Sequence, residues 1–221
     1  MSMPLLLQLW RTDMLNELIE RYPVLRQIKD EIKNASDEII ACYEKGGKVL
    51  LCGNGGSAAD CEHIVGELMK GFLKKRPLSD EKKKEMKTAF PDIDEKLLSF
   101  LQCGLPAVSL PSMTALNSAF CNDVEPEFIY AQAVLSLAKE KDILIAISTS
   151  GNSKNVCAAV EVAKAIGCKV IGLTGRTGGR LKEYSDICIC VPEDETFKIQ
   201  ELHLPVYHCI CAMTEEHFYK E

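Results

Sequence analysis

Apolar residues recur at helical spacing through the first 45 residues of the chain. Positions three or four residues apart share one face of a helix, so this pattern is typical of amphipathic helices. Pro23 interrupts the pattern, because proline removes a backbone hydrogen bond inside a helix. We therefore expect two or three helices within residues 1–45. The apolar positions that carry the pattern are Leu15, Leu18, Ile19, Leu25, Ile28, Ile32, Ile39, Ile40 and Tyr43.

Short apolar runs then alternate with stretches of helical pattern. Runs of this kind, bounded by glycine or polar turns, are typical of strands buried on both faces. Strands that alternate with helices indicate a parallel sheet covered by right-handed crossovers, with the ligand at the carboxyl ends of the strands. We predict one α/β domain over residues 1–221, a doubly wound parallel sheet flanked by helices. The expected strands are residues 48–52, 105–110, 143–147, 169–173 and 187–191, and residues 155–166 are an expected helix.

Residues 78–104 depart from this rhythm. The stretch is rich in lysine, aspartate and glutamate, yet it holds enough apolar residues for two short helices separated at Pro91. We favour a solvated surface excursion beside the ligand pocket that is expected at the strand ends. The alternative is a lid or a subunit contact over that pocket.

Composition narrows the classes of function. With 32 acidic and 26 basic residues the formal net charge is -6, which argues against a nucleic-acid partner, so any phosphate must be held locally. The 11 cysteines include no CxxC pair and lie mostly in apolar runs, as in the core of a reduced protein. No apolar run approaches the roughly 20 residues that span a membrane, and residues 1–10 lack a basic leader. We expect a cytoplasmic protein without a membrane partner.

Two loops at strand ends could bind an anion. Gly53–Ser57 reads GNGGS and opens a helix, so its glycines let backbone N–H groups converge near a helix N-terminus. Ser148–Ser153 reads STSGNS and offers hydroxyl groups before a second helix. Each loop alone is more typical of an ordinary helix cap. Two such loops at strand ends favour a phosphate monoester. A dinucleotide is disfavoured, because neither loop matches the GxGxxG pattern of dinucleotide-binding proteins.

Two pairs of polar residues could carry chemistry. His63 and Glu67 are four residues apart on one helix, and Gln200 and His208 are eight residues apart near the C-terminus. If the two pairs converge, they could bind a divalent metal or could supply an acid and a base.

These motifs in this order resemble the SIS (sugar isomerase) domain family, and within it the phosphoheptose isomerases. The resemblance covers roughly residues 30–217 apart from residues 78–104. The segments that carry it are Gly53–Ser57, His63 with Glu67, Asn122–Asp123, Ser148–Ser153, Leu173–Gly175 and Ile199–His208.

The resemblance implies a flavodoxin-like fold and a set of site residues. It implies that Ser57, Ser148, Thr149, Ser150 and Ser153 hold a sugar phosphate. It also implies that the rest of the substrate site is lined by Asn54, Gly55, Gly56, Asn122, Asp123 and Gln200, and that zinc is bound by His63, Glu67, Gln200 and His208.

The reaction that the resemblance implies interconverts ketose and aldose phosphates through an enediol. Its substrate would be sedoheptulose 7-phosphate and its product D-glycero-D-manno-heptose 7-phosphate. Such a reaction needs a base beside carbon and an acid beside the carbonyl oxygen, and we assign these roles to Glu67 and His208. Glu67 could instead act as a metal ligand, and both roles stay open.

The chain departs from the family pattern at two points besides the insertion. Lys70, Gly71 and Phe72 stand where many relatives have an arginine, and Pro205 lies between Gln200 and His208, where it could kink the helix.

The alternatives to an isomerase are a non-catalytic scaffold that binds a replication initiator and a sugar-phosphate sensor. The resemblance also implies a homotetramer with sites between subunits.

Overall fold

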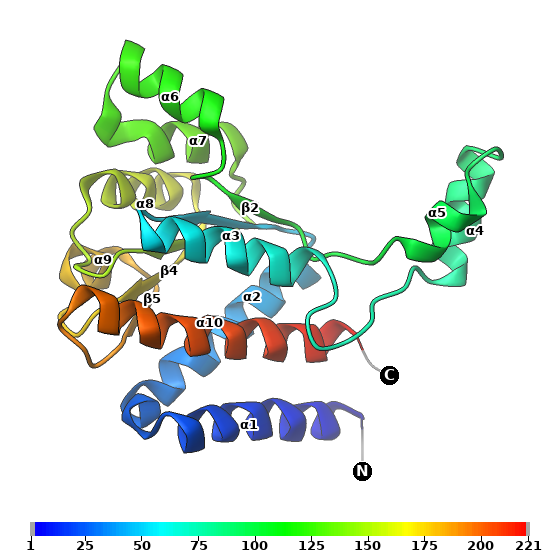
Figure 1. Ribbon diagram of the computed structural model, residues 1–221, viewed down its shortest axis with the longest axis horizontal. Coiled ribbons are helices and arrows are strands. Elements are labelled where there is room, and N and C mark those ends of the chain that lie inside the picture. Colours follow the sequence, from blue (N-terminus) through cyan, green and yellow to red (C-terminus); the bar gives the residue numbers. More distant parts are fainter. Residues whose placement is uncertain (1–2, 220–221) are drawn as a thin grey trace.

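Five parallel strands form the centre of the protein (Figure 1). The computed structural model describes the backbone of residues 3–219 and the side chains of residues 11–219. The strand order is β2-β1-β3-β4-β5, which is a doubly wound arrangement and confirms the predicted fold class. The strands are β1 (Val49–Cys52), β2 (Ala107–Ser109), β3 (Ile143–Ile147), β4 (Lys169–Thr174) and β5 (Ile187–Cys190).

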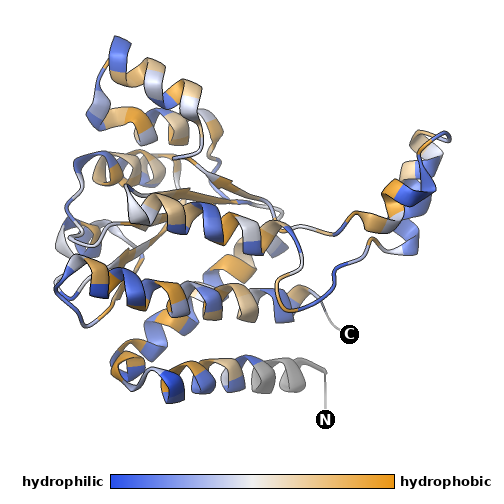
Figure 2. Ribbon diagram, in the orientation of Figure 1, coloured by the Kyte–Doolittle hydropathy of each residue, from blue (hydrophilic) through white to orange (hydrophobic). Residues whose placement is uncertain are grey.

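Helices cover both faces of the sheet because alternate strand residues point to opposite sides. Leu51 and Ile145 belong to the core under α2 (Lys29–Glu44), α3 (Gly56–Met69) and α10 (Thr196–Phe218). Leu50 and Leu144 belong to a second core under α7 (Ile129–Leu137) and α8 (Lys154–Ile166). The hydrophobic strands therefore lie between two helical layers (Figure 2).

The predicted N-terminal helices are α1 (Met3–Arg21), the short 3-10 helix η1 (Pro23–Ile28) and α2. Pro23 opens η1, so the break falls where the sequence indicates. Helix α1 lies along α10 on the outside of the molecule (Figure 1) and buries Leu15 and Leu18. Further elements of the α/β body are α6 (Thr114–Asp123), η2 (Pro126–Phe128) and α9 (Gly179–Tyr184).

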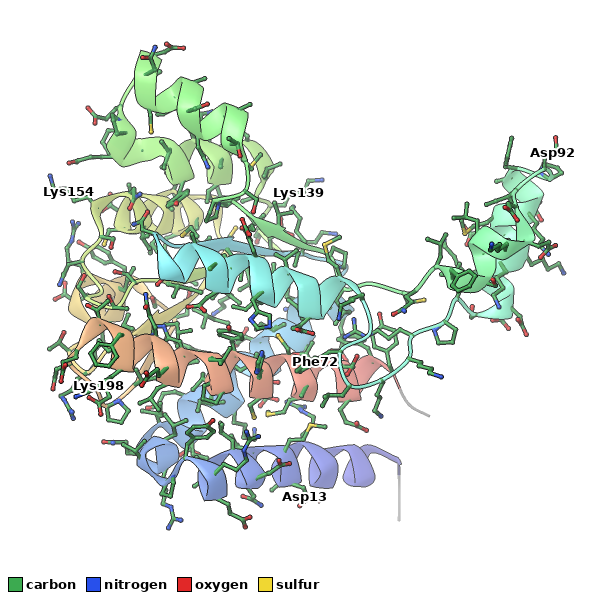
Figure 3. All side chains as sticks on the ribbon, in the orientation of Figure 1. Asp13, Phe72, Asp92, Lys139, Lys154 and Lys198 are labelled. Carbon is green, nitrogen blue, oxygen red and sulfur yellow. The ribbon has the colours of Figure 1, made fainter. Side chains whose placement is uncertain are left out.

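Residues 78–104 form the predicted pair of short helices, α4 (Asp80–Ala89) and α5 (Glu95–Phe100), with Pro91 between them. The pair projects away from the sheet, with Asp92 at its far tip (Figures 1 and 3). Contrary to the expectation from the sequence, it therefore does not lie beside a pocket of its own chain. Leu98 is 1% exposed inside the pair, whereas Phe100 is 73% exposed. Within one chain the pair is a surface excursion, and whether it contacts another subunit stays a prediction.

Helices α3 and α10 run side by side in the same direction (Figure 1). Gly56 at the start of α3 lies against Gln200 near the start of α10, and His63 lies against Tyr207 two turns further on. We call this pair of helices the α3–α10 seam. Helix α10 continues through the buried Pro205, so the proline does not end it before His208.

The cysteines behave as the composition indicates. All are free thiols, and most of them are buried, among them Cys52 and Cys61. Among residues 3–219 no helix is both long enough and apolar enough to cross a bilayer.

Candidate active site

The two predicted phosphate loops lie next to each other, because they follow the neighbouring strands β1 and β3. This position is the switch point of the sheet, where doubly wound folds bind their ligands. The side-chain amides of Asn54 and Asn155 exchange two hydrogen bonds, each 2.9 Å long, and so join the first loop to the start of α8. The buried Tyr130 hydroxyl donates to the carbonyl oxygen of Gly53 at 2.7 Å and fixes that loop from below.

The second loop gathers serine hydroxyl groups at the N-terminus of α8. The Ser148 oxygen lies 2.9 Å from that of Ser153 and 3.5 Å from that of Ser150. Ser153 is the N-cap residue of α8, yet its side chain does not cap the helix. An uncapped helix N-terminus beside three hydroxyl groups is a favourable site for a phosphate dianion.

Two glycines give the loops their shape. Gly55, at the N-cap of α3, has φ 55°, and Gly151 has φ 66°, a backbone region that other residues rarely adopt. A Cβ atom on Gly151 would come within 2.0 Å of the Gly178 carbonyl oxygen, so the turn that precedes α9 packs directly on the serine loop. The loop sequence therefore determines both the backbone path and its support.

A second group of polar residues lies along the α3–α10 seam. His63, Glu67 and His208 each offer a ligand atom, and these three atoms lie within 4.8 Å of one another. The Nε2 atom of His63 is 3.2 Å from Glu67 Oε1 and 3.3 Å from His208 Nε2. The structure thus brings together both residues predicted as base and acid and three of the four predicted zinc ligands.

The donor set fits a zinc ion. Two imidazole nitrogens and a carboxylate oxygen are the usual protein ligands of a catalytic zinc site. Glu67 Oε2 is buried and accepts no hydrogen bond from any residue that the structure describes, and the Lys70 ammonium lies 3.6 Å from it. A carboxylate oxygen without a hydrogen-bond donor is consistent with a cation as its partner.

Burial affects the protonation of the cluster. Burial is the largest cause that lowers the pKa of His208, and the neighbouring His63 lowers it further. The neutral form of His208, which can act as a metal ligand or exchange a proton, is therefore favoured. Burial also raises the pKa of Asp60 and of Tyr207, whose hydroxyl group lies 3.2 Å from Asp60 Oδ1.

A buried ion pair closes the far end of the seam. Arg76 is 1% exposed, and its Nε atom donates to Glu215 Oε1 on α10 at 2.7 Å. Its other nitrogens donate to the carbonyl oxygens of Leu68 and Glu67, at the C-terminal turn of α3. Glu215 also accepts backbone N–H bonds from Phe72, Leu73 and Lys74. These contacts fix the end of the helix that carries Glu67.

The remaining predicted site residues lie outside this cluster. The Gln200 amide lies against Gly56, at the phosphate-loop end of the seam. Asn122 donates to Asp123 at 2.7 Å, and both are exposed at the end of α6. Ser57 is buried in the first turn of α3, and the Thr149 carbonyl oxygen accepts the N–H of Gly175. Their contacts with a substrate stay a prediction.

A cavity of about 310 Å³ opens beside His208, between α1 and α10. The Phe72 ring, 5.5 Å from the His208 ring, lines it from the segment after α3 (Figure 3). Its walls are mostly apolar, with Glu17 and Arg21 at α1. The serine loop is not among the residues that line it, so this cavity and the phosphate loops are separate features of one chain.

The sequence did not point to several of the residues that build this site. Asp60 could have been found, because it lies three residues before His63 on the same helical face. Tyr207, Arg76 and Glu215 carry no local signal, since only the fold brings them to α3.

Two protein families match parts of this chain, and both are SIS domains. The SIS domain family matches residues 115–212, and a second SIS domain family matches residues 13–92. Fold and site thus define an SIS-domain protein.

The curated relatives are more specific. A phosphoheptose isomerase from Nitratiruptor sp. is 37% identical over 91% of this chain and 96% of its own length. One from Helicobacter pylori is 38% identical over 88% of each chain. The chain therefore belongs to the phosphoheptose isomerase family.

Solved structures of phosphoheptose isomerases are similar to this chain along most of its length. The phosphoheptose isomerase of Neisseria gonorrhoeae has a TM-score of 0.71 and 30% identity, over 95% of this chain and 98% of that one. The enzyme of Francisella tularensis has a TM-score of 0.70 and 32% identity, over 92% and 97%.

Proposed function

We propose that this protein is an aldose–ketose isomerase that converts sedoheptulose 7-phosphate to D-glycero-D-manno-heptose 7-phosphate. The observation that carries the proposal is the convergence of His63, Glu67 and His208 on a seam whose start adjoins two phosphate loops. The names of the relatives supply the substrate. They also favour an enzyme over the scaffold and sensor alternatives.

The phosphate group is held at the serine loop. Ser148, Ser150 and Ser153 donate hydroxyl hydrogens to its oxygens, and the uncapped N-terminus of α8 supplies backbone N–H groups and a positive dipole end. Seven residues separate Gly56 from His63, a rise of about 10 Å along α3. That distance suits an extended sugar better than a triose, because each carbon–carbon bond adds at most about 1.5 Å.

Proton transfer takes place at the other end of the sugar. The Glu67 carboxylate removes a proton from C1, the C1–H electrons form the C1=C2 bond, and the C2 oxygen takes a proton from His208. The resulting enediol collapses when His208 takes the O1 proton and Glu67 returns a proton to C2, which gives the aldose and restores both residues. No change of oxidation state occurs overall.

His63, Glu67 and His208 would hold zinc, and Gln200 is the fourth predicted ligand. When bound, zinc supplies positive charge that stabilises an enediolate oxygen. Within one chain, the position of Gln200 against Gly56 favours its substrate-binding role. We also propose a homotetramer, since the cavity beside His208 and the phosphate loops are separate within one chain. The protein would act in the cytoplasm.

Turnover in deuterium oxide tests both reaction and mechanism. Purified protein, with and without added zinc, is given sedoheptulose 7-phosphate, and the product is followed by proton NMR. We expect the aldose 7-phosphate with deuterium at C2, because the proton that Glu67 takes from C1 exchanges with solvent before a proton is returned to C2. Absence of turnover on this substrate under both conditions would contradict the proposed function, and turnover without deuterium uptake would contradict the enediol route.

A further inference from the structure

Both ring nitrogens of His63 have a defined neighbour. Its Nε2 atom faces Glu67 and His208, as described above. Its Nδ1 atom lies 3.0 Å from the hydroxyl oxygen of Tyr207 on α10. The ring is therefore held between a phenol on one side and the polar cluster on the other.

The Tyr207 hydroxyl group has a second partner, Asp60. Its oxygen lies 3.2 Å from Asp60 Oδ1, one turn before His63 on α3. Tyr207 is 3% exposed, and Asp60 Oδ2 is buried without a hydrogen bond from any described residue. Asp60, Tyr207 and His63 thus form a short chain of contacts that crosses the seam twice.

The direction of these hydrogen bonds follows from the groups themselves. An ionised carboxylate can only accept, so the Tyr207 O–H donates to Asp60. A hydroxyl group has a single hydrogen, so its oxygen must accept from the N–H at Nδ1 of His63. A neutral imidazole has one N–H, which leaves the Nε2 atom with its lone pair toward Glu67 and His208.

We propose that Asp60 and Tyr207 are positioning residues that hold His63 in the tautomer with its hydrogen on Nδ1. The lone pair on Nε2 is then available to the cluster before any ligand arrives. Metal-binding histidines in proteins usually donate their other N–H to an outer partner, and loss of that partner costs about 10-fold to 100-fold in metal affinity. Here the outer partner is a tyrosine that a carboxylate orients. This inference rests on the proposed role of His63 as a zinc ligand.

The reverse arrangement would have a different consequence. If Tyr207 donated to Nδ1, the hydrogen of His63 would stand on Nε2 and point at Glu67 and His208. That hydrogen would have to leave before a cation could bind to the ring. The two tautomers therefore differ in a measurable property of the metal-free protein.

Removal of one hydroxyl group separates this role from packing. The Tyr207 ring makes edge contacts with the rings of His63 and His208, at centroid distances of 5.5 and 5.0 Å. Tyr207→Phe keeps the ring and removes the hydroxyl group, and with it both the acceptor for the Nδ1 hydrogen and the donor to Asp60. Tyr43→Phe is a matched control, because the buried Tyr43 hydroxyl donates to the Pro106 carbonyl oxygen in another part of the core.

The test uses nitrogen NMR of protein labelled with ¹⁵N-histidine. The chain has four histidines, so the ring signals can be assigned with His63→Gln as the reference. Metal-free protein is measured at a pH at which the imidazoles are neutral, and zinc affinity is measured by calorimetry. Thermal unfolding shows whether each variant is folded.

We expect His63 of the unchanged protein to carry its hydrogen on Nδ1. Tyr207→Phe should shift the ring toward the other tautomer and weaken zinc binding about 10-fold to 100-fold. Asp60→Asn should shift the tautomer in the same direction, and Tyr43→Phe should leave both readouts unchanged. If the NMR results hold but the unchanged protein binds no zinc, the positioning role stands and the proposed metal site is wrong. A hydrogen on Nε2 in the unchanged protein, or a tautomer that Tyr207→Phe does not alter, would overturn the inference.

Discussion

The α3–α10 seam ends where the segment that leads to the α4–α5 pair begins, at the end of α3, yet the two regions are built in opposite ways. In the seam, buried polar groups from distant parts of the sequence bond to one another, as Arg76 does with Glu215. In the α4–α5 pair, exposed charges pair with neighbours in the same excursion, as Lys82 does with Glu85, and Phe100 remains exposed. The seam fixes side chains relative to each other, and the pair fixes only itself.

This difference shows where the fold can support chemistry. A proton-transfer site needs groups held within a fraction of an ångström, and buried hydrogen bonds and ion pairs provide that precision when every member is satisfied. The seam supplies such contacts around His63 and leaves Glu67 Oε2 to the proposed cation, whereas the α4–α5 pair does not constrain any side chain of the cluster. Substitutions in the two regions should therefore differ in kind as well as in size.

The largest expected effect is on catalysis at the seam. Glu67→Gln removes the proposed base and keeps the side-chain shape, so kcat should fall about 10²-fold to 10⁴-fold while binding of the sugar phosphate persists. Glu62→Gln is the matched control, because Glu62 is an exposed glutamate on the same helix that accepts a hydrogen bond from Ser112. Steady-state kinetics and calorimetry measure the two quantities. Activity that survives in Glu67→Gln would show that another group is the base.

The next effect is on stability. Glu215→Gln leaves the Arg76 guanidinium buried without its counter-charge, and loss of one partner from a buried ion pair costs about 3–5 kcal/mol. Lys82→Ala removes an exposed pair in α4, where about 0–1 kcal/mol is expected. Urea unfolding of both variants compares the two regions directly. Equal losses would show that the seam is no more tightly constrained than the α4–α5 pair.

A pH effect on stability is expected from His203 in α10, which is fully buried with neither ring nitrogen hydrogen-bonded to a described residue. Burial lowers its pKa to about 4. The unfolded chain, with a pKa near 6.5, takes up the proton first, so the free energy of unfolding should fall as pH drops from about 6.5 to about 4. The total loss from this group is about 3 kcal/mol. Above pH 6.5 it has no effect.

His203→Gln removes this titration. The free energy of unfolding of the unchanged protein should therefore fall relative to that of the variant as pH drops from about 6.5 to about 4, and the difference should be constant above pH 6.5. Urea unfolding at several pH values from 4 to 8 measures the slope, which does not depend on the absolute stability of the variant. Identical slopes in the two proteins would contradict the prediction, because they would mean that the pKa of His203 is the same in the folded and unfolded chain.

The smallest effect is expected in the α4–α5 pair, at an exposed side chain. Phe100→Ser alters a side chain that is 73% exposed, so the free energy of unfolding should change by less than about 0.5 kcal/mol. Sedimentation of the same variant distinguishes the two interpretations of residues 78–104. An unchanged assembly agrees with a surface excursion, whereas a smaller assembly would assign the α4–α5 pair to a subunit contact.

Most of the fold could be predicted from the sequence, because local patterns specify it. The apolar runs at 143–147 and 169–173 read as buried strands, and they are β3 and β4. Pro23 and Pro91 mark the breaks between helices, since proline acts on its own backbone. The direction of the α4–α5 pair away from the sheet could not be predicted, because it depends on the path of the flanking segments and not on local composition.

The site was predicted less completely, and the reason is physical. His63 and Glu67 share a helical face, so their spacing alone brings them together. Their contact with His208 was expected from family resemblance, and the geometry of α3 beside α10 provides it. The role of Arg76 could not be predicted, because nothing nearby in the sequence reveals that it becomes buried against Glu215.

The central claim is that one sugar phosphate reaches from the serine loop to the cluster on the seam. A crystal structure with bound sedoheptulose 7-phosphate tests it most directly. We expect the phosphate within hydrogen-bond distance of Ser148, Ser150 and Ser153, and C1 and C2 beside Glu67 and His208. A sugar whose C1 and C2 lie away from both residues in every copy of the assembly would contradict the claim.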